Sequence, residues 1–213
     1  VGQGGEWLLC QPSFGSSNVA QALGDFRQLR INEWLASGVN PYPEDFIELY
    51  NPTGLPAALG GLFLTDQPIG APRLSPIAPL SFIAPGGWTA FIADGNLGAG
   101  ANHANFKLEM DQGEIGLMAP DQTVIDSVIY GPQQTDVANG RCPDGNVAVK
   151  ALMVPTPGAP NACPSTPPAA STESLLALNA TWAYESLGSD LGTAWRTTNY
   201  NDSAWPRGRG VFG

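Results

Sequence analysis

Short apolar runs alternate with clusters of glycine, proline, asparagine and aspartate along most of this chain of 213 residues. Residues 29–35 alternate between apolar and polar side chains. One face of that predicted strand carries Leu29, Ile31, Glu33 and Leu35. Further strand candidates lie at residues 45–50, 59–66, 80–84, 88–93, 106–110, 114–118, 123–130 and 147–154. No long amphipathic helix interrupts them, so the pattern predicts an all-β sandwich or barrel.

Turn-forming residues separate these candidates and set their connections. Residues 111–113, Asp-Gln-Gly, predict a tight hairpin between the candidates on either side. Residues 51–54, Asn-Pro-Thr-Gly, predict a turn. Residues 155–161 contain three prolines, which lack the backbone donor of a central strand. We therefore expect this last segment to terminate the sandwich and leave it.

Composition divides the chain into four parts. Residues 1–28 have one apolar patch and no domain-like pattern, whereas residues 29–163 hold the predicted sandwich. Residues 164–173 are rich in proline, serine and threonine and predict an extended linker. Residues 174–213 are rich in aromatic side chains, but this part of the chain is too short to bury them by itself. The tryptophans of this part are Trp182, Trp195 and Trp205.

Two short segments resemble each other across the central region. Residues 12–18 and 155–161 share proline, glycine and asparagine at matching positions, with serine in place of threonine. Their separation is close to the length of the central region, which favours a tandem array in which residues 1–28 end a preceding unit. A chance match is the alternative. Apolar patches at both ends also predict head-to-tail assembly by strand addition at a free sheet edge.

The bulk composition excludes several classes of function. Glycine and proline number 26 and 20, as a chain with many turns requires, and only 13% of residues are charged. The net charge is −10 without any cluster of lysine and arginine, so nucleic-acid binding is not expected. No apolar run reaches the length of a membrane span. No signal peptide is visible at Val1, which indicates a removed signal or an excised piece.

The three cysteines are Cys10, Cys142 and Cys163, and none belongs to a CxxC motif. A zinc site of cysteine and histidine is not expected, because the chain has one histidine. Cys142 and Cys163 flank the last predicted strand and the proline-rich segment, so we predict a disulfide between them. Closing a loop of roughly 20 residues stabilises a fold by about 3 kcal/mol and indicates an oxidising compartment. Cys10 is then free or linked to another unit.

Candidate catalytic residues are few. His103 would have to serve any serine–histidine–aspartate triad, but the chain has no GxSxG elbow. Glu33 and Glu48 form the best carboxylate pair for glycoside hydrolysis. They interrupt apolar strands, so a structural role in which each pairs with or caps another group is favoured. The three tryptophans of residues 174–213 could stack on sugars, although a core position is favoured. We expect no enzyme.

Calcium is the one metal that the composition favours, because oxygen ligands are plentiful in an acidic chain. Asp94 and Asn96 form one candidate loop, and Asn201 and Asp202 form another. Neither has the spacing of an EF-hand, so both remain weak candidates, and no other cofactor is expected.

The central region resembles the lamin tail domain. The residues that carry the resemblance are 31–36 (Ile-Asn-Glu-Trp-Leu-Ala), 45–52, 59–66, 83–87, 140–145 and 155–161 (Pro-Thr-Pro-Gly-Ala-Pro-Asn), and they cover about 29–163. The resemblance implies an immunoglobulin-like β-sandwich with a role in surface attachment or assembly. Residues 174–213 resemble the truncated start of a galactose-binding-like jelly roll, carried by 181–184, 192–195 and 200–205.

These observations lead to one expected function and one alternative. We expect a non-catalytic structural and adhesive module of a secreted or cell-surface protein, with extra terminal β segments through which it self-assembles. Its partners would be other protein modules or copies of itself. The alternative is a carbohydrate-binding accessory module of a secreted multidomain hydrolase.

Overall fold

The computed structural model describes residues 8–164 and 180–209. It divides into two compact units, Val1–Ser165 and Thr166–Gly213. Strands and three short 3₁₀ helices make up the regular structure, which confirms the all-β class. Nearly all of the predicted linker falls outside the described residues. Within the described part of the chain, no helix is long and apolar enough to span a membrane.

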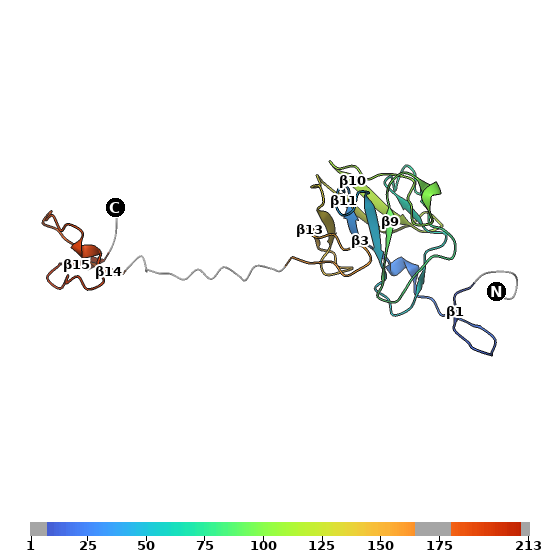
Figure 1. The fold of residues 1–213 in the computed structure, drawn as a ribbon, viewed down its shortest axis with the longest axis horizontal. Coiled ribbons are helices and arrows are strands. Elements are labelled where there is room, and N and C mark those ends of the chain that lie inside the picture. The colour runs from blue at the N-terminus through green and yellow to red at the C-terminus, as the bar shows by residue number, and fades with distance from the viewer. Residues whose placement is uncertain (1–7, 165–179, 210–213) are drawn as a thin grey trace. The chain divides into compact units, whose positions relative to one another are not determined.

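Two antiparallel sheets face each other in the first unit, so the predicted sandwich is confirmed (Figure 1). The five-stranded sheet has the order β13-β12-β3-β4-β9, with β3 (Arg30–Leu35), β4 (Phe46–Tyr50), β9 (Trp88–Ile92), β12 (Ala138–Arg141) and β13 (Val149–Leu152). The four-stranded sheet has the order β11-β10-β6-β7, with β6 (Phe63–Thr65), β7 (Ser75–Pro76), β10 (Gly113–Met118) and β11 (Val124–Tyr130). Apolar side chains from both sheets, including Trp34, Ile47, Leu64 and Ile115, share one buried core.

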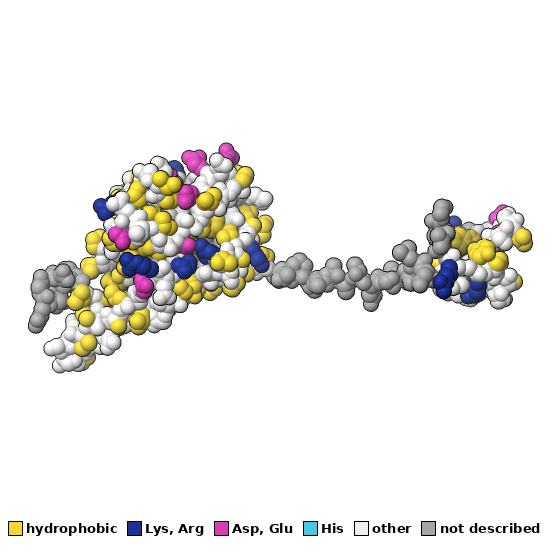
Figure 2. Space-filling model, turned by 180° about the vertical axis from the view of Figure 1, so that it is seen from behind, with side chains coloured by type: hydrophobic (Ala, Val, Ile, Leu, Met, Phe, Trp, Pro, Cys, Tyr) yellow, Lys and Arg dark blue, Asp and Glu magenta, His cyan; other side chains and the backbone are white. Residues whose placement is uncertain are grey.

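Short elements accompany the two main sheets. The two-stranded pairs are β1 (Cys10–Gln11) with β2 (Val19–Ala20), and β5 (Ala57–Ala58) with β8 (Phe82–Ile83). The 3₁₀ helices of this unit are η1 (Phe26–Gln28) and η2 (Leu97–Ala99). Residues 51–54 form the predicted turn: Asn51 is fully buried, and its side chain accepts the Thr53 N–H and donates to Leu55 O. On the face shown in Figure 2, charged side chains are sparse among uncharged ones.

The predicted strand at residues 106–110 is wrong, and so is the tight hairpin after it. This segment is a loop, and its isolated bridge joins Lys107 to Asp94, which lies after the end of β9. Phe106 and Leu108 are buried, but their backbone has no neighbouring strand to pair with. The apolar spacing here reflects side chains that fill the core from a loop. The other predicted strands are present, most of them shortened at their ends.

The predicted face of residues 29–35 is wrong because strand β3 contains a bulge at Asn32. Ile31 lies opposite Leu49, and Glu33 lies opposite the preceding residue Glu48, so Asn32 is the extra residue. An extra residue reverses the alternation of side chains across the sheet. Leu29 and Ile31 therefore enter the main core, whereas Glu33 and Leu35 point to the outer face of the five-stranded sheet.

Strand β12 had no counterpart among the predicted strands, although it lies inside the five-stranded sheet. Its sequence, Ala-Asn-Gly-Arg, has weak β propensity. Arg141 on this strand donates to the carbonyl of Ile31 at 2.8 Å and pairs with Asp126 of β11 at 3.0 Å. Because β11 belongs to the opposite sheet, this buried arginine links the two layers at one edge.

The second unit is described for residues 180–209. It contains β14 (Thr181–Ala183) paired with β15 (Arg207–Arg209), and η3 (Ala194–Arg196). The expected burial of its tryptophans is not met, since Trp182 and Trp195 are 36% and 50% exposed and Trp205 is only partly buried. Too few residues surround them to form a core.

Candidate functional site

Two glutamates occupy neighbouring strands on the outer face of the five-stranded sheet. Glu33 of β3 lies directly opposite Glu48 of β4, and both side chains are fully buried. The bulge at Asn32 places Glu33 on this face. On its other side Glu33 lies opposite Gly140 of β12, which has no side chain to fill the space above the sheet. The sheet thus forms a floor on which the two carboxylates lie on neighbouring strands.

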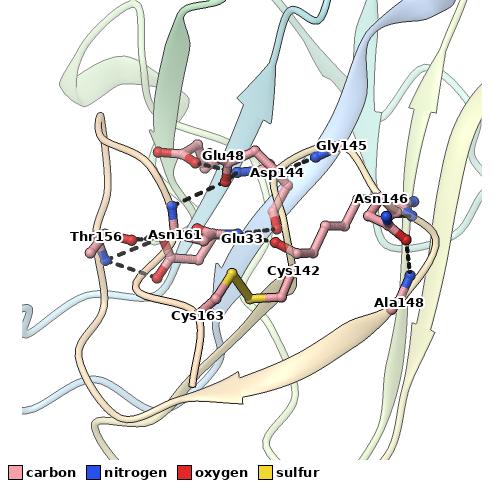
Figure 3. Close-up of a disulfide and its surroundings, with 12 residues drawn as sticks. Glu33, Glu48, Cys142, Asp144, Gly145, Asn146, Ala148, Thr156, Asn161 and Cys163 are labelled. Atoms are coloured by element: carbon pink, nitrogen blue, oxygen red, sulfur yellow. Dashed lines mark hydrogen bonds between the residues drawn. A yellow bond between two sulfur atoms is a disulfide. The ribbon is translucent and has the colours of Figure 1, made fainter. Parts of the chain in front are cut away.

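Residues 155–161, which we call the latch, cover this floor and donate hydrogen bonds to the carboxylate oxygens (Figure 3). Thr156 donates its N–H to Glu33 at 2.9 Å and its hydroxyl at 3.0 Å. Gly158 donates its N–H to Glu48. The expectation that each glutamate pairs with or caps another group is confirmed. The segment joins no strand, as expected, but the expectation that it leaves the sandwich is wrong, because the latch is bonded to the sheet through both glutamates.

Asn32 and Asp144 complete the site. We call these two residues and the two glutamates the acidic receptor. The Asn32 amide donates to Glu48 and to Asp144, each at 3.0 Å, and its oxygen accepts the Gly145 N–H at 2.9 Å. Asp144 also accepts the N–H of Asn161 at 3.0 Å. The bulged residue therefore connects the floor of the receptor to the loop that forms its wall.

The latch sits close to the backbone of the sheet. The Asn161 amide donates to Arg141 O at 2.8 Å and to Asn32 O at 3.3 Å. A β carbon on Gly140 would lie 2.7 Å from the Asn161 amide nitrogen and 2.6 Å from Leu152 Cδ1. Such distances are shorter than real contacts, so a side chain at position 140 requires Asn161 and Leu152 to shift.

A disulfide fixes the end of the latch, as predicted. Cys142 follows β12 and Cys163 follows the latch, with their Cα atoms 5.5 Å apart. Figure 3 shows the sulfur bridge beside Asn161. Cys10 is free and partly buried.

Burial dominates the electrostatics of the receptor. It raises the pKa of Glu48 to about 7, against hydrogen bonds from Asn32 and Gly158 that lower it, while the charges of Glu33 and Asp144 add to the rise. Burial also raises the pKa of Glu33, against the hydrogen bonds from Thr156. No ion pair among the described residues includes either glutamate. The carboxylates are held by N–H and O–H donors rather than by cations.

This arrangement binds a polar turn of polypeptide. Each glutamate is fully buried beneath the latch, and both carboxylates already accept its donors. A glycosidic substrate cannot reach them while the latch is closed. The chemistry available at the surface is therefore recognition of backbone and hydroxyl donors.

An apolar groove of about 280 Å³ lies beside the latch at the β9 edge of the same sheet. The side chains that give it its apolar wall are Tyr42, Pro43, Phe46, Ala90, Ile92 and Pro157. We call it the side groove. Pro157 belongs to the latch, so the side groove borders the segment that covers the acidic receptor.

The remaining candidate residues lie apart from this surface. His103 Nδ1 lies 2.8 Å from Asp94 Oδ2, and this contact joins two positions of the loop that follows β9. Asp94 Oδ1 also accepts the Asn96 N–H. In the second unit, Asn201 accepts the Ser203 N–H and Asp202 lies 3.8 Å from Arg207. The described residues contain no group of three or more histidine, cysteine or acidic side chains suited to a metal. Calcium binding at either loop stays a prediction.

The sequence indicated part of the receptor only. The glutamates stood out because they interrupt apolar strands, whereas Asn32 and Asp144 gave no signal of their own. The glycine of the latch, with φ of +85°, follows a proline as in a type II turn, and that pattern was readable. Comparison of this chain with protein families, with curated proteins and with solved structures finds no match.

Proposed function

We propose that this chain is a non-catalytic structural and adhesive module of a secreted or cell-surface protein, and that its sandwich is of the immunoglobulin-like, lamin-tail type. The observation that carries the proposal is the way the chain leaves the sandwich. A latch bound to two buried glutamates and closed by the Cys142–Cys163 disulfide secures the exit point.

Such an exit suits a module that transmits tension to its neighbours. A pull on the chain beyond residue 163 meets the disulfide first, and the latch bonds lie within the protected loop. Structural disulfides persist in extracellular and envelope compartments and are rare in the cytosol. The anchoring chemistry thus supports both parts of the proposal, the mechanical role and the location.

Thiol trapping in cells that naturally produce the protein tests the location. Alkylation at lysis, followed by peptide mapping, should find Cys142 and Cys163 joined in protein from the medium or the cell envelope. Deleting residues 29–163 from the protein should then weaken attachment of those cells and leave secreted enzymatic activities unchanged. Cytosolic protein with both thiols alkylated contradicts the proposal, and so does attachment that survives the deletion.

Carbohydrate binding is a second candidate, favoured by the exposed tryptophans of the second unit. Trp195 is half exposed, and Trp182 is also accessible. Aromatic rings of this kind provide flat apolar faces that suit the apolar face of a sugar ring. Titration with soluble oligosaccharides, with Trp195→Ala as the variant, tests it. Binding that the variant loses supports this candidate, and heats equal to dilution in both proteins reject it.

A further inference from the structure

The N-terminal loop, residues 12–18, has the same local structure as the latch. Gly15 has φ of +74° where Gly158 has +85°, and each is the second residue of a two-residue turn, after Phe14 and Pro157 respectively. The hydroxyl of Ser13 donates to the Asn18 side-chain oxygen at 2.8 Å. In the latch the Thr156 hydroxyl lies 3.4 Å from the side-chain oxygen of Asn161, while its proton is donated to Glu33. The sequence match between the two segments therefore extends to conformation.

The N-terminal loop offers the donors that the acidic receptor accepts. Thr156, Gly158 and Asn161 supply every bond from the latch to the receptor carboxylates. Ser13, Gly15 and Asn18 stand at the matching positions of the loop. The described structure assigns these three no bond to a carboxylate, and strands β1 and β2 hold the loop together at its base. Figure 1 shows this hairpin extending from the sandwich.

A second, independent feature joins the loop to the same surface. Phe14 is fully exposed at 108% of its reference area, and it matches Pro157, the latch residue that lines the side groove. A phenylalanine at that position has an apolar hollow beside it, formed by Phe46, Ala90 and Ile92. Burial of a large exposed apolar side chain favours association.

We propose that residues 12–18 are a second latch that closes the acidic receptor of another copy of this chain, with Phe14 filling the side groove. The inference rests on the proposed role as an assembling surface module and names the contact. Within one molecule the receptor is filled by residues 155–161, so exchange requires that this segment be displaced. The loop and the receptor are different surfaces, so successive exchanges build a head-to-tail chain.

The first test grafts the loop sequence onto the latch. The variant T156S/P157F/A159S/P160S gives residues 155–161 the sequence of residues 12–18. Hydrogen exchange at the amides of residues 156 and 158 should stay within a few-fold of the original chain. The matched control has the same composition with glycine and phenylalanine exchanged, T156S/P157G/G158F/A159S/P160S, and should exchange at least about tenfold faster, because phenylalanine resists positive φ. Equal loss of protection in both variants overturns the proposal.

The second test opens the receptor and follows assembly. The double variant T156V/N161A removes latch side-chain donors and leaves the receptor intact. By sedimentation equilibrium it should associate more strongly than the original chain. Adding S13A/N18A should abolish that gain, and adding F14A should weaken association about tenfold or more. Association that is no stronger than in the original chain, or that ignores these loop changes, overturns the proposal. Near-ultraviolet circular dichroism checks folding, and the graft remains decisive if the opened chain does not fold.

The two proposals fail in distinguishable ways. A secreted, disulfide-bonded protein that stays monomeric after latch opening rejects the second latch and leaves the proposed function in place. A cytosolic protein with free Cys142 and Cys163 rejects the proposed function whatever the assembly result.

Discussion

Thr156 donates two hydrogen bonds to the carboxylate of Glu33, a residue 123 positions earlier in the chain. The N–H reaches Oε1 at 2.9 Å and the hydroxyl reaches Oε2 at 3.0 Å. This contact joins the segment that follows the last strand of the sandwich to the first long strand. The anchoring of the latch, and with it both proposals above, depends on such long-range bonds.

Replacing Thr156 by valine should lower the free energy of unfolding by about 1–2 kcal/mol, because one bond to a buried carboxylate is lost. Thr156→Ser keeps the hydroxyl and is the matched control, with an expected loss of less than about 1 kcal/mol. Urea titrations of the three proteins at one pH provide the measurement. A loss in Thr156→Ser as large as that in Thr156→Val would contradict the assignment of the effect to the hydroxyl.

The stability of the first unit should rise as the pH falls from about 8 to about 5.5. Burial raises the pKa of Glu48 to about 7, above the ordinary 4.5 of an unfolded glutamate. The folded state therefore binds the proton more tightly, and its contribution to stability is lost as the pH rises through 7. The change expected from this group over that range is roughly 2 kcal/mol.

Glu48→Gln tests the assignment, because glutamine resembles the protonated acid and does not titrate. Denaturant unfolding of the variant should have a flatter pH profile between about pH 5.5 and 8. A profile parallel to that of the original chain would place the titrating group elsewhere. Glu33 contributes with the same sign, because burial also raises its pKa.

Gly140→Ala should destabilise the first unit by about 1–3 kcal/mol through overpacking. The new methyl group would meet Leu152 and Asn161 at less than 3 Å. Gly131→Ala is the control, since nothing lies within 4 Å of its added β carbon. Thermal unfolding should separate the two variants clearly. A neutral Gly140→Ala would mean that the latch can shift without loss.

Removing the disulfide by Cys163→Ser should lower the free energy of unfolding by about 3 kcal/mol, given the 21-residue separation of its cysteines. The latch bonds remain in this variant, so the sandwich should still fold. Intact mass before and after reduction gives the starting state, and guanidinium unfolding gives the loss. Free thiols at both positions in protein purified without reductant would contradict the pairing.

Local sequence pattern determined the all-β class, most of the strands and the cysteine pairing. Alternation and turn residues are short-range features, so they can be recognised in the sequence without knowing what packs against each face of a strand. The disulfide was readable because Cys142 and Cys163 bracket the last strand and its exit. The glutamates were conspicuous because a charge within an apolar strand demands a partner.

Tertiary structure alone decided the face of Glu33, the strand β12 and the receptor itself. The bulge at Asn32 reverses the alternation, and the side-chain amide of this residue donates to both Glu48 and Asp144. Strand β12 pairs despite weak propensity, because its neighbours β3 and β13 supply the backbone partners. Those partners are distant in sequence. The pattern of residues along the chain therefore does not indicate which buried donor will bond to which acceptor.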